Sequence, residues 1–341
     1  MLKPFIARLV EGRSLSADEA AEAMHAIMGG GAPPAQVGAY LVALRFKGET
    51  VAEILGSARV VREGTTPVRS TRTDLLDTCG TGGDGSSSFN VSTASALVVA
   101  GAGVAVAKHG NRSISSRCGS ADLLEACGVP LDLSPEQIAA TLDEAGIGFL
   151  FAPALNLAMA AVAPIRRQLG LRTVFNLMGP LANPAGARRQ LLGVYDVRWV
   201  EPLAEVLAGL GCERALVVHG LEGLDEISVS GPTRAALLES GSITSMQLTP
   251  ESFGLPAHPV GAVRGGDPEE NLARLGRILN GEPGPWRDAV VANAGAALWI
   301  AGSARDLAGG ARLAESVIDS GEGTAALQRL VSVSRRHAAG G

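Results

Sequence analysis

Apolar residues in the first 66 positions recur every three or four residues, which is the spacing of amphipathic helices, and no run in this segment is typical of a strand. Capping-box signatures at Ser16 and Thr50 begin two of the four helices that the pattern predicts, and Pro33-Pro34 opens another. We therefore expect a small helical domain over residues 1–66, joined by part of residues 165–185.

From residue 74 onward, short apolar runs typical of buried strands alternate with helical segments. Strands are expected at residues 74–77, 104–107, 147–151, 190–195 and 214–219, and two more at 234–238 and 243–248 have the spacing of a hairpin. Helices are expected over residues 94–102, 134–145, 153–169 and 172–178, and again from residue 268. This alternation predicts a large α/β domain over residues 74–335, with a mostly parallel sheet, an antiparallel edge and a helical C-terminal part. The small polar tail after Val333 is expected to fray.

Composition narrows the class of protein further. At 341 residues the chain is long enough for two domains, and 46 % hydrophobic with 4 % aromatic residues predicts a core of aliphatic side chains. A net charge of -5 argues against general nucleic-acid binding. Four cysteines without a C-x-x-C pair indicate reduced thiols rather than disulfides or a metal centre. With no signal-peptide pattern and no apolar run long enough to span a bilayer, we expect a soluble, cytoplasmic protein.

Positive charge is concentrated in the stretch from Cys79 to Asp122. After Asp84 this stretch has no acidic residue until Asp122, yet it contains Lys108, Arg112 and Arg117 among many Gly, Ser, Thr and Asn residues. Because the basic residues follow one predicted strand and a glycine-rich loop follows the strand before it, the two segments are expected to meet at one edge of the sheet. Such a group of cations, hydroxyls and amides suits a ligand that has several oxyanions.

The glycine-rich loop is predicted to span Gly80 to Gly85, between a strand and a helix whose start Asn90 to Thr93 can cap. Glycines allow positive φ and let backbone N–H groups surround an anion, while the helix N-terminus adds partial positive charge. The predicted ligand is phosphate or pyrophosphate. The loop also matches G-x-G-x-x-G, but no Asp or Glu follows about 20 residues later for the ribose of a dinucleotide. A glycine turn without any ligand is the other alternative.

Several motifs in fixed order resemble those of the anthranilate phosphoribosyltransferase family, over about residues 75–227. They are GTGGD, NVSTAS, KHGNRSISS, GSADLLEACG, FAPALNLAMAAVAPIRRQLGLRTVFNLMGPLANP and GLDE. The resemblance implies transfer of the 5-phosphoribosyl group of phosphoribosyl pyrophosphate (PRPP) to the amine of anthranilate, in tryptophan biosynthesis, by a homodimer that associates through its small helical domain.

Residue roles can be carried over position by position. The resemblance implies that the PRPP site is lined by Gly80, Gly83, Asp84, Ser88, Asn90, Val91, Ser92, Thr93, Lys108, His109, Gly110, Asn111, Arg112, Ser113, Ile114, Ser115, Ser116 and Ser120. It assigns magnesium (Mg2+) to the adjacent acids Asp225 and Glu226, with Ser92 at a second magnesium site. From the residue types alone, the two acids are also the best candidates for a hard cation, and Lys108 is the candidate for charge compensation.

The resemblance places the acceptor at Gly80, Asn111 and Arg166, and an arginine fork suits the anthranilate carboxylate. His109 could accept a proton or only shape the pocket. One departure concerns the acceptor: where the family has F-A-P-x-x-H-P-A-M-K, this chain has Asn156, Leu157 and Ala160 in place of the His, Pro and Lys. Transfer to a different aromatic acid therefore remains an alternative. A pyrimidine nucleoside phosphorylase and a non-catalytic nucleic-acid-binding relative, which share the fold that the resemblance implies, are two others.

Overall fold

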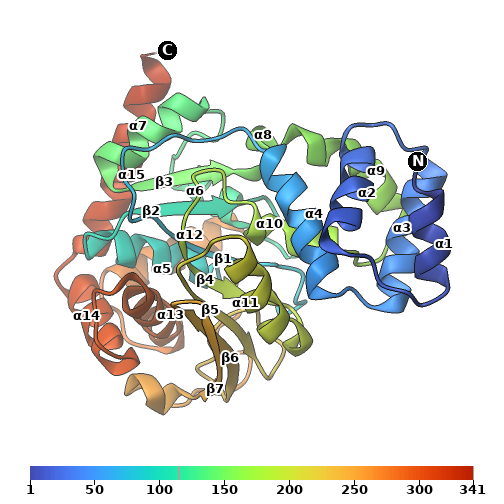
Figure 1. Ribbon diagram of the computed structural model, residues 1–341. Helices are drawn as coiled ribbons and strands as arrows, with labels where there is room; N and C mark the ends of the chain where they lie inside the picture. Colours follow the sequence, from blue (N-terminus) through green and yellow to red (C-terminus); the bar gives the residue numbers. More distant parts are fainter. Residues whose placement is uncertain (114–115, 341) are drawn as a thin grey trace.

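The computed structural model describes residues 1–113 and 116–340, without the side chains at 157, 158, 160 and 161. Four helices begin the chain and lie to one side of a central sheet (Figure 1): α1 (Lys3–Val10), α2 (Ala17–Met28), α3 (Pro34–Lys47) and α4 (Val51–Glu63). Both predicted capping boxes are confirmed, because Ser16 and Thr50 each accept a hydrogen bond from the amide three residues later. Helix α9 (Leu157–Leu169) packs against α2 and α3, so this helical unit includes a later segment of the chain.

The predicted α/β fold is confirmed. The described residues form a seven-stranded sheet in the order β3-β2-β1-β4-β5-β6-β7. Its strands are β1 (Leu76–Gly80), β2 (Val106–Gly110), β3 (Ile147–Phe151), β4 (Arg189–Gly193), β5 (Arg214–Gly220), β6 (Thr233–Glu239) and β7 (Ser242–Leu248). Strands β3, β2, β1, β4 and β5 are parallel to their neighbours, and β6 and β7 form the predicted antiparallel edge.

Helices cover both faces of this sheet (Figure 1). On one face, α5 (Val91–Gly101) packs against α13 (Pro285–Ala301) and α15 (Glu322–Ala339). On the other, α11 (Val200–Gly209) packs against β5 and β6, and α10 (Phe175–Leu181) against α4. The remaining helices are α6 (Ser120–Ala126), α7 (Pro135–Ala145), α8 (Ala152–Leu155), α12 (Pro268–Leu279) and α14 (Leu307–Asp319), with 3-10 turns at Val197–Trp199 and Pro250–Phe253.

Successive strand residues point into different cores, as the period of two requires. Leu191 belongs to the core beneath α5 and α13, whereas Leu192 belongs to the core shared with α4 and α11. Aliphatic side chains and alanine make up most of both cores, as the low aromatic content of the sequence predicts.

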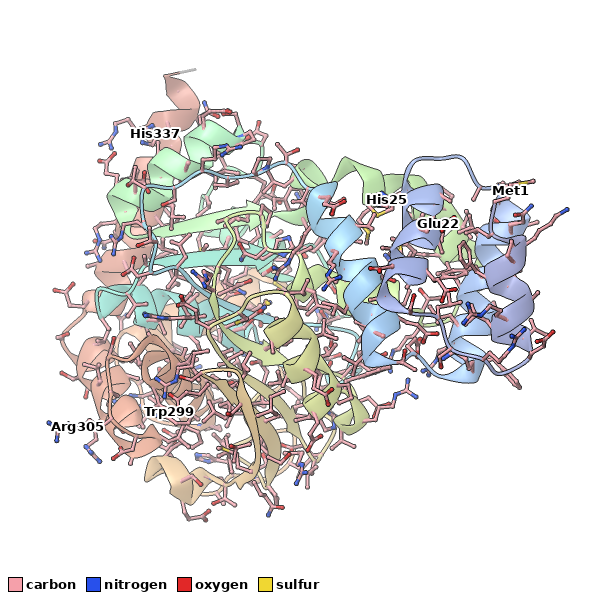
Figure 2. The ribbon with its side chains drawn as sticks, in the orientation of Figure 1. Met1, Glu22, His25, Trp299, Arg305 and His337 are labelled. Carbon is pink, nitrogen blue, oxygen red and sulfur yellow. The ribbon has the colours of Figure 1, made fainter. Side chains whose placement is uncertain are left out.

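Several sequence-based boundaries were wrong. Strands β1 and β2 begin later and extend further than predicted, so Gly80, Lys108, His109 and Gly110 are strand residues rather than loop residues. Helix α10 begins at Phe175, which leaves Arg172 in the turn before it. The tail is not frayed, because α15 continues to Ala339, with His337 near its end (Figure 2). The carbonyl of His337 accepts a hydrogen bond from the side chain of Gln137.

Candidate active site

The carboxyl ends of four parallel strands meet at one edge of the sheet. Strands β1, β2, β4 and β5 end at Gly80, Gly110, Gly193 and Gly220, and polar loops follow each of them. In open α/β sheets this edge is where ligands bind. The sequence predicted that the glycine-rich segment and the basic segment meet at one edge of the sheet. This is confirmed, because the strands that precede them, β1 and β2, are parallel neighbours.

The glycine loop after β1 contains three residues with positive φ angles, a backbone conformation that residues other than glycine rarely adopt. Gly82, Gly83 and Gly85 have φ angles of 62°, 72° and 76°. Gly80 is required for a different reason, because a Cβ at this position would overlap the Oδ2 atom of Asp225. The loop is thus held close against the segment that follows β5.

Asp225 is fixed against this loop through its side chain and its backbone. The amide of Gly82 donates a 2.7 Å hydrogen bond to Asp225 Oδ2. A Cβ at Gly193, the last residue of β4, would overlap the backbone carbonyl of Asp225. Glycines at the ends of β1 and β4 therefore let the loop after β5 cross the sheet edge and reach the glycine loop.

Three carboxyl groups gather where these loops meet. The amide of Asp225 lies 3.4 Å from Asp84 Oδ2, and the amide of Ser92 donates a 3.2 Å bond to Glu226 Oε1. Burial, followed by the charge of Asp84, raises the pKa of Asp225 to about 7. Burial and the neighbouring Asp225 raise the pKa of Glu226 well above its usual range. In the metal-free protein the two carboxyl groups therefore hold their protons to higher pH than free carboxyls do, because their ionised forms are disfavoured here.

A divalent cation would stabilise the ionised forms of these carboxyl groups. Among the described residues, no group of three or more His, Cys, Asp or Glu side chains has the arrangement of a complete metal site. Magnesium needs no such group, because it is usually held by one or two carboxylates together with water and substrate phosphate oxygens. Asp225 and Glu226, with the Ser92 hydroxyl close by, fit this requirement.

Lys108 is a buried cation beside the carboxyl groups. Its side chain extends from β2, and Nζ donates to the carbonyl of Thr78 at 2.5 Å and to Ser92 Oγ at 3.4 Å. Its charge partly opposes the rise in the pKa of Glu226. The ammonium therefore lies at the N-terminal end of α5, where the helix dipole also favours anions.

We predicted that polar side chains cap the start of α5, but the N-cap side chain makes no hydrogen bond to the first turn of the helix. Asn90 occupies the cap position, but its amide group donates to the carbonyl of Cys118 at 3.0 Å and accepts from Asn271 at 2.9 Å. The cap prediction was wrong because long-range polar partners compete with the local amide. Val91 and Thr93 are buried in this turn, whereas Ser88 pairs in a β-bridge with Arg264.

The loop after β2 positions small polar groups at the edge of the site. Asn111 receives a 3.2 Å hydrogen bond at its carbonyl from Ser120, and a Cβ at Gly110 would overlap that Ser120 hydroxyl. Ser113 and Ser116 hydrogen-bond to each other. The predicted ligand residues Ile114 and Ser115 lie outside the described residues.

Two of the three predicted cations are already paired with carboxylates. Arg112 donates to Asp122 and Glu125, at 2.7 to 2.9 Å, and Arg117 to Asp267 at 3.1 Å. The structure therefore brings Lys108, and not Arg112 or Arg117, against the carboxyl cluster. That Arg112 contacts PRPP stays a prediction.

His109 points away from solvent. It is 7 % exposed, its amide donates to Asp77 Oδ1 at 3.1 Å, and burial lowers the pKa of its imidazole. A neutral, buried ring is suited to shaping the pocket.

The candidate acceptor residue Arg166 lies near the end of α9. Its guanidinium carbon is 5.7 Å from the centre of the Phe175 ring, and partial burial lowers its pKa. The neighbouring Arg167 is exposed. Arg166 is therefore the one of the pair that has a defined environment.

Asn156, which replaces the family's histidine, is committed to structural contacts. Its Nδ2 donates to Thr65 Oγ1 at 2.8 Å and lies 3.4 Å from the carbonyl of Val61, while its Oδ1 caps α9 through the amide of Met159. These contacts join α9 to the end of α4. The other two departures, at 157 and 160, lie among the side chains outside the description.

Sequence reasoning missed Gly193, Tyr195 and Arg172. Gly193 ends β4 beside Asp225, and the amide of Tyr195 donates to Thr81 Oγ1 at 3.0 Å, so the loop after β4 also borders the glycine loop. Gly193 lies within the strand predicted at residues 190–195, and a glycine inside a strand pattern could have indicated the close approach of another backbone. An open groove of about 980 Å³ is lined by Phe151, Arg112 and Arg335 among others, and the carboxyl cluster is not part of its lining.

Comparison with known proteins identifies the class. The model of the glycosyl transferase family a/b domain matches residues 72–324, and that of the family's helical bundle domain matches residues 3–64. The chain belongs to this glycosyl transferase family.

Within that class, relatives of nearly full length share one name. Anthranilate phosphoribosyltransferase of Symbiobacterium thermophilum is 52 % identical over 335 residues, with 98 % of each chain covered. The crystal structure of the enzyme from Thermus thermophilus has a TM-score of 0.91 at 48 % identity, covering 97 % of this chain and 99 % of that one. The Saccharomyces cerevisiae enzyme in complex with PRPP and Mg has a TM-score of 0.90 at 27 % identity, with 98 % of each chain covered. The chain is thus a member of the anthranilate phosphoribosyltransferases, and the sequence-based recognition is confirmed.

Proposed function

We propose that this protein transfers the 5-phosphoribosyl group of PRPP to the amine of anthranilate, which gives N-(5-phosphoribosyl)anthranilate and pyrophosphate, a step of tryptophan biosynthesis. The observation that carries the proposal is the hydrogen bond between Gly82 and Asp225, which joins an anion-binding glycine loop to a pair of carboxylates at the ligand-binding edge of the sheet. Family membership supplies the reaction class.

In this reaction the bond from the ribose anomeric carbon to pyrophosphate breaks, and a bond from that carbon to the amine nitrogen forms. Negative charge grows on the departing pyrophosphate, so groups that stabilise it lower the barrier. Lys108 supplies a fixed positive charge beside the first turn of α5, and the amides of the glycine loop supply further donors. The amine is neutral at pH 7, so its attack needs no strong base, and it loses a proton to reach the product.

Mg2+, when bound, would neutralise and orient the pyrophosphate oxygens. Asp225 and Glu226 would hold it, with Ser92 assisting at a second ion. The raised pKa values of the two carboxyls support this assignment, because a bound cation would stabilise the ionised forms that burial and the neighbouring carboxylates disfavour. Asp84, the third carboxyl, contacts the amide of Asp225 and the Ser86 hydroxyl, and so orders the loop.

For the acceptor, we assign Arg166 to the anthranilate carboxylate, with Gly80 and Asn111 bordering the same pocket. Partial burial of the guanidinium strengthens its attraction for an anion. Asn156 is not assigned a contact with the acceptor, because its amide is used by α4 and α9.

The loss of anthranilate fluorescence tests this function directly, with PRPP and Mg2+ present. Turnover that depends on both is the expected result. Turnover with another aromatic acid and none with anthranilate would make the protein a related phosphoribosyltransferase. Phosphorolysis of thymidine or uridine without Mg2+ would instead indicate a nucleoside phosphorylase.

We further propose that residues 1–66, with part of 165–185, form a dimerisation domain and that residues 74–335 form the PRPP-binding domain. Exposed apolar side chains support a homodimer, since Phe46 on α3 is 94 % exposed and Val42 is on the same helix. Met1 lies at the outer end of the helical unit, away from the sheet (Figure 2). An exposed apolar face of this kind is typical of a protein interface.

We assign the protein to the cytoplasm. All four cysteines are free thiols, which is what a reducing compartment maintains. None of the helices in the described part of the chain could cross a membrane.

A further inference from the structure

Arg172 connects the turn between α9 and α10 to the glycine loop. Its guanidinium donates a hydrogen bond to the backbone carbonyl of Gly83, 89 positions earlier in the chain. The same guanidinium lies over the ring of Tyr195, with its carbon 4.4 Å from the ring centre. An exposed arginine is thus held at both its edge and its face.

The ring under Arg172 is itself fixed. Tyr195 is 8 % exposed, and its hydroxyl accepts a 3.1 Å hydrogen bond from the indole of Trp199. Its amide donates to Thr81 Oγ1. Arg172 therefore contacts the glycine loop directly at Gly83 and indirectly, through Tyr195, at Thr81.

The carbonyl that Arg172 holds determines the direction of the next amide. In a planar trans peptide the C=O and N–H bonds point to opposite sides, so fixing the Gly83 carbonyl fixes the N–H of Asp84. Gly83 has a φ of 72° and open space at its Cβ position, so Gly83 itself does not restrain this peptide, and Arg172 adds a restraint on its carbonyl to the contacts that the Asp84 side chain makes. A loop that binds anions through its amides needs this orientation to be set before the ligand arrives.

The same turn follows the candidate acceptor residue. Arg166 lies in the last turn of α9, and Gly170 ends that helix in the left-handed region at φ 63°. Phe175, which begins α10, contacts the Arg166 guanidinium. One short turn therefore links the acceptor arginine to the arginine that touches the donor loop.

We propose that Arg172 is a positioning residue for the glycine loop: it fixes the Gly83-Asp84 peptide and couples the PRPP site to the acceptor turn. The consequence for PRPP rests on the proposed function, whereas the consequence for loop order does not.

Hydrogen exchange in the ligand-free protein tests the loop directly. Arg172→Ala is expected to speed exchange over residues 81–87 by about tenfold, which corresponds to losing roughly 1.4 kcal/mol. Arg167→Ala, which removes an exposed arginine near the end of α9, is the matched control and should leave this segment unchanged. Equal exchange in Arg172→Ala and wild type would overturn the proposal, whatever the enzyme's substrates.

Steady-state kinetics give the second readout. Arg172→Ala should raise the KM for PRPP about tenfold, with kcat and the unfolding temperature nearly unchanged. Arg172→Lys, which retains a donor but not the planar stack, should give an intermediate KM. A fall in kcat with an unchanged PRPP KM would contradict the positioning role. If the wild-type protein showed no turnover at all, the proposed function would be wrong. The hydrogen-exchange result alone would then decide whether Arg172 positions the glycine loop.

Discussion

The amide of Gly82 donates a 2.7 Å hydrogen bond to Oδ2 of Asp225, although 143 positions separate the two residues. Strand β4 lies between the strands that precede them in the chain, β1 and β5, so the contact spans three strands of the sheet. It joins the loop that we assign to the donor's phosphates with the carboxylate that we assign to Mg2+. Donor binding and metal binding therefore depend on this junction.

Gly80→Ala should impair the junction by steric overlap alone. The new Cβ would lie only 2.4 Å from Asp225 Oδ2, so the carboxylate must move and we expect at least a tenfold loss of kcat/KM, about 1.4 kcal/mol. Gly276→Ala is the control, because no atom lies near its Cβ position and it lies in the middle of α12. That variant should retain activity and gain roughly 0.5–1 kcal/mol of stability. Wild-type activity in Gly80→Ala would show that Asp225 need not stay where the structure places it.

Removing the Asp225 carboxyl should change how stability depends on pH. The folded-state pKa is raised from 3.8 to about 7, so between these values the folded protein binds a proton that the unfolded chain has lost. Stability from this group is therefore present at low pH and is lost as pH rises towards 7, by at most about 1.4 kcal/mol per pH unit. Denaturant titrations of the metal-free protein should show this fall in wild type, and a smaller fall in Asp225→Asn. Parallel curves for the two proteins would refute the raised pKa.

Substituting each of the two adjacent arginines of α9 should have different effects on the KM for anthranilate. Arg166→Ala removes a partly buried cation and should raise the anthranilate KM about 10- to 100-fold, as expected for a hydrogen bond to a charged group worth about 1.5–3 kcal/mol. Arg167→Ala, at an exposed position, should leave it within about twofold. A change in PRPP affinity alone in Arg166→Ala would contradict the acceptor assignment.

The exposed side chains of α3 should determine the oligomeric state. Phe46→Glu combined with Val42→Ser places charge and polarity on the apolar face and should shift the protein from dimer to monomer in sedimentation velocity. Val260→Ser, at an exposed apolar position outside the helical unit, is the control and should remain dimeric. A dimer that survives the double substitution would place the interface elsewhere.

Local sequence patterns predicted the bounds of a strand correctly where the polarity of its residues matched their burial in the folded protein. The run Ile147–Phe151 follows a glycine and consists largely of apolar side chains, and β3 has these bounds. The pattern failed at β2, where Lys108 and His109 suggested a loop. Both are buried in the strand, because Thr78 and Ser92 accept from the lysine and Asp77 binds the histidine amide.

The charges of single residues were a poor guide to which cations lie at the candidate site. The sequence suggested that three cations could bind oxyanions. In the structure, Arg112 and Arg117 instead pair with acidic residues on α6 and at the start of α12, and the sequence does not show that these residues lie close by. The contacts of Asn156 and Arg172 depend on which helix ends come together, and no pattern of single residues encodes that. Gly193 could have been found, since glycine at the end of a parallel strand allows another backbone to approach.

Calorimetric titration of PRPP into the protein tests the central claim most directly. With Mg2+ present, we predict binding heat at one site per chain in wild type. That heat should be lost without the metal, and strongly reduced in the double variant Asp225→Asn, Glu226→Gln but not in Glu269→Gln, an exposed acid on α12. Absence of heat from correctly folded wild-type protein with Mg2+, or undiminished binding by the double variant, would contradict the claim that the glycine loop and the two carboxylates together hold the donor.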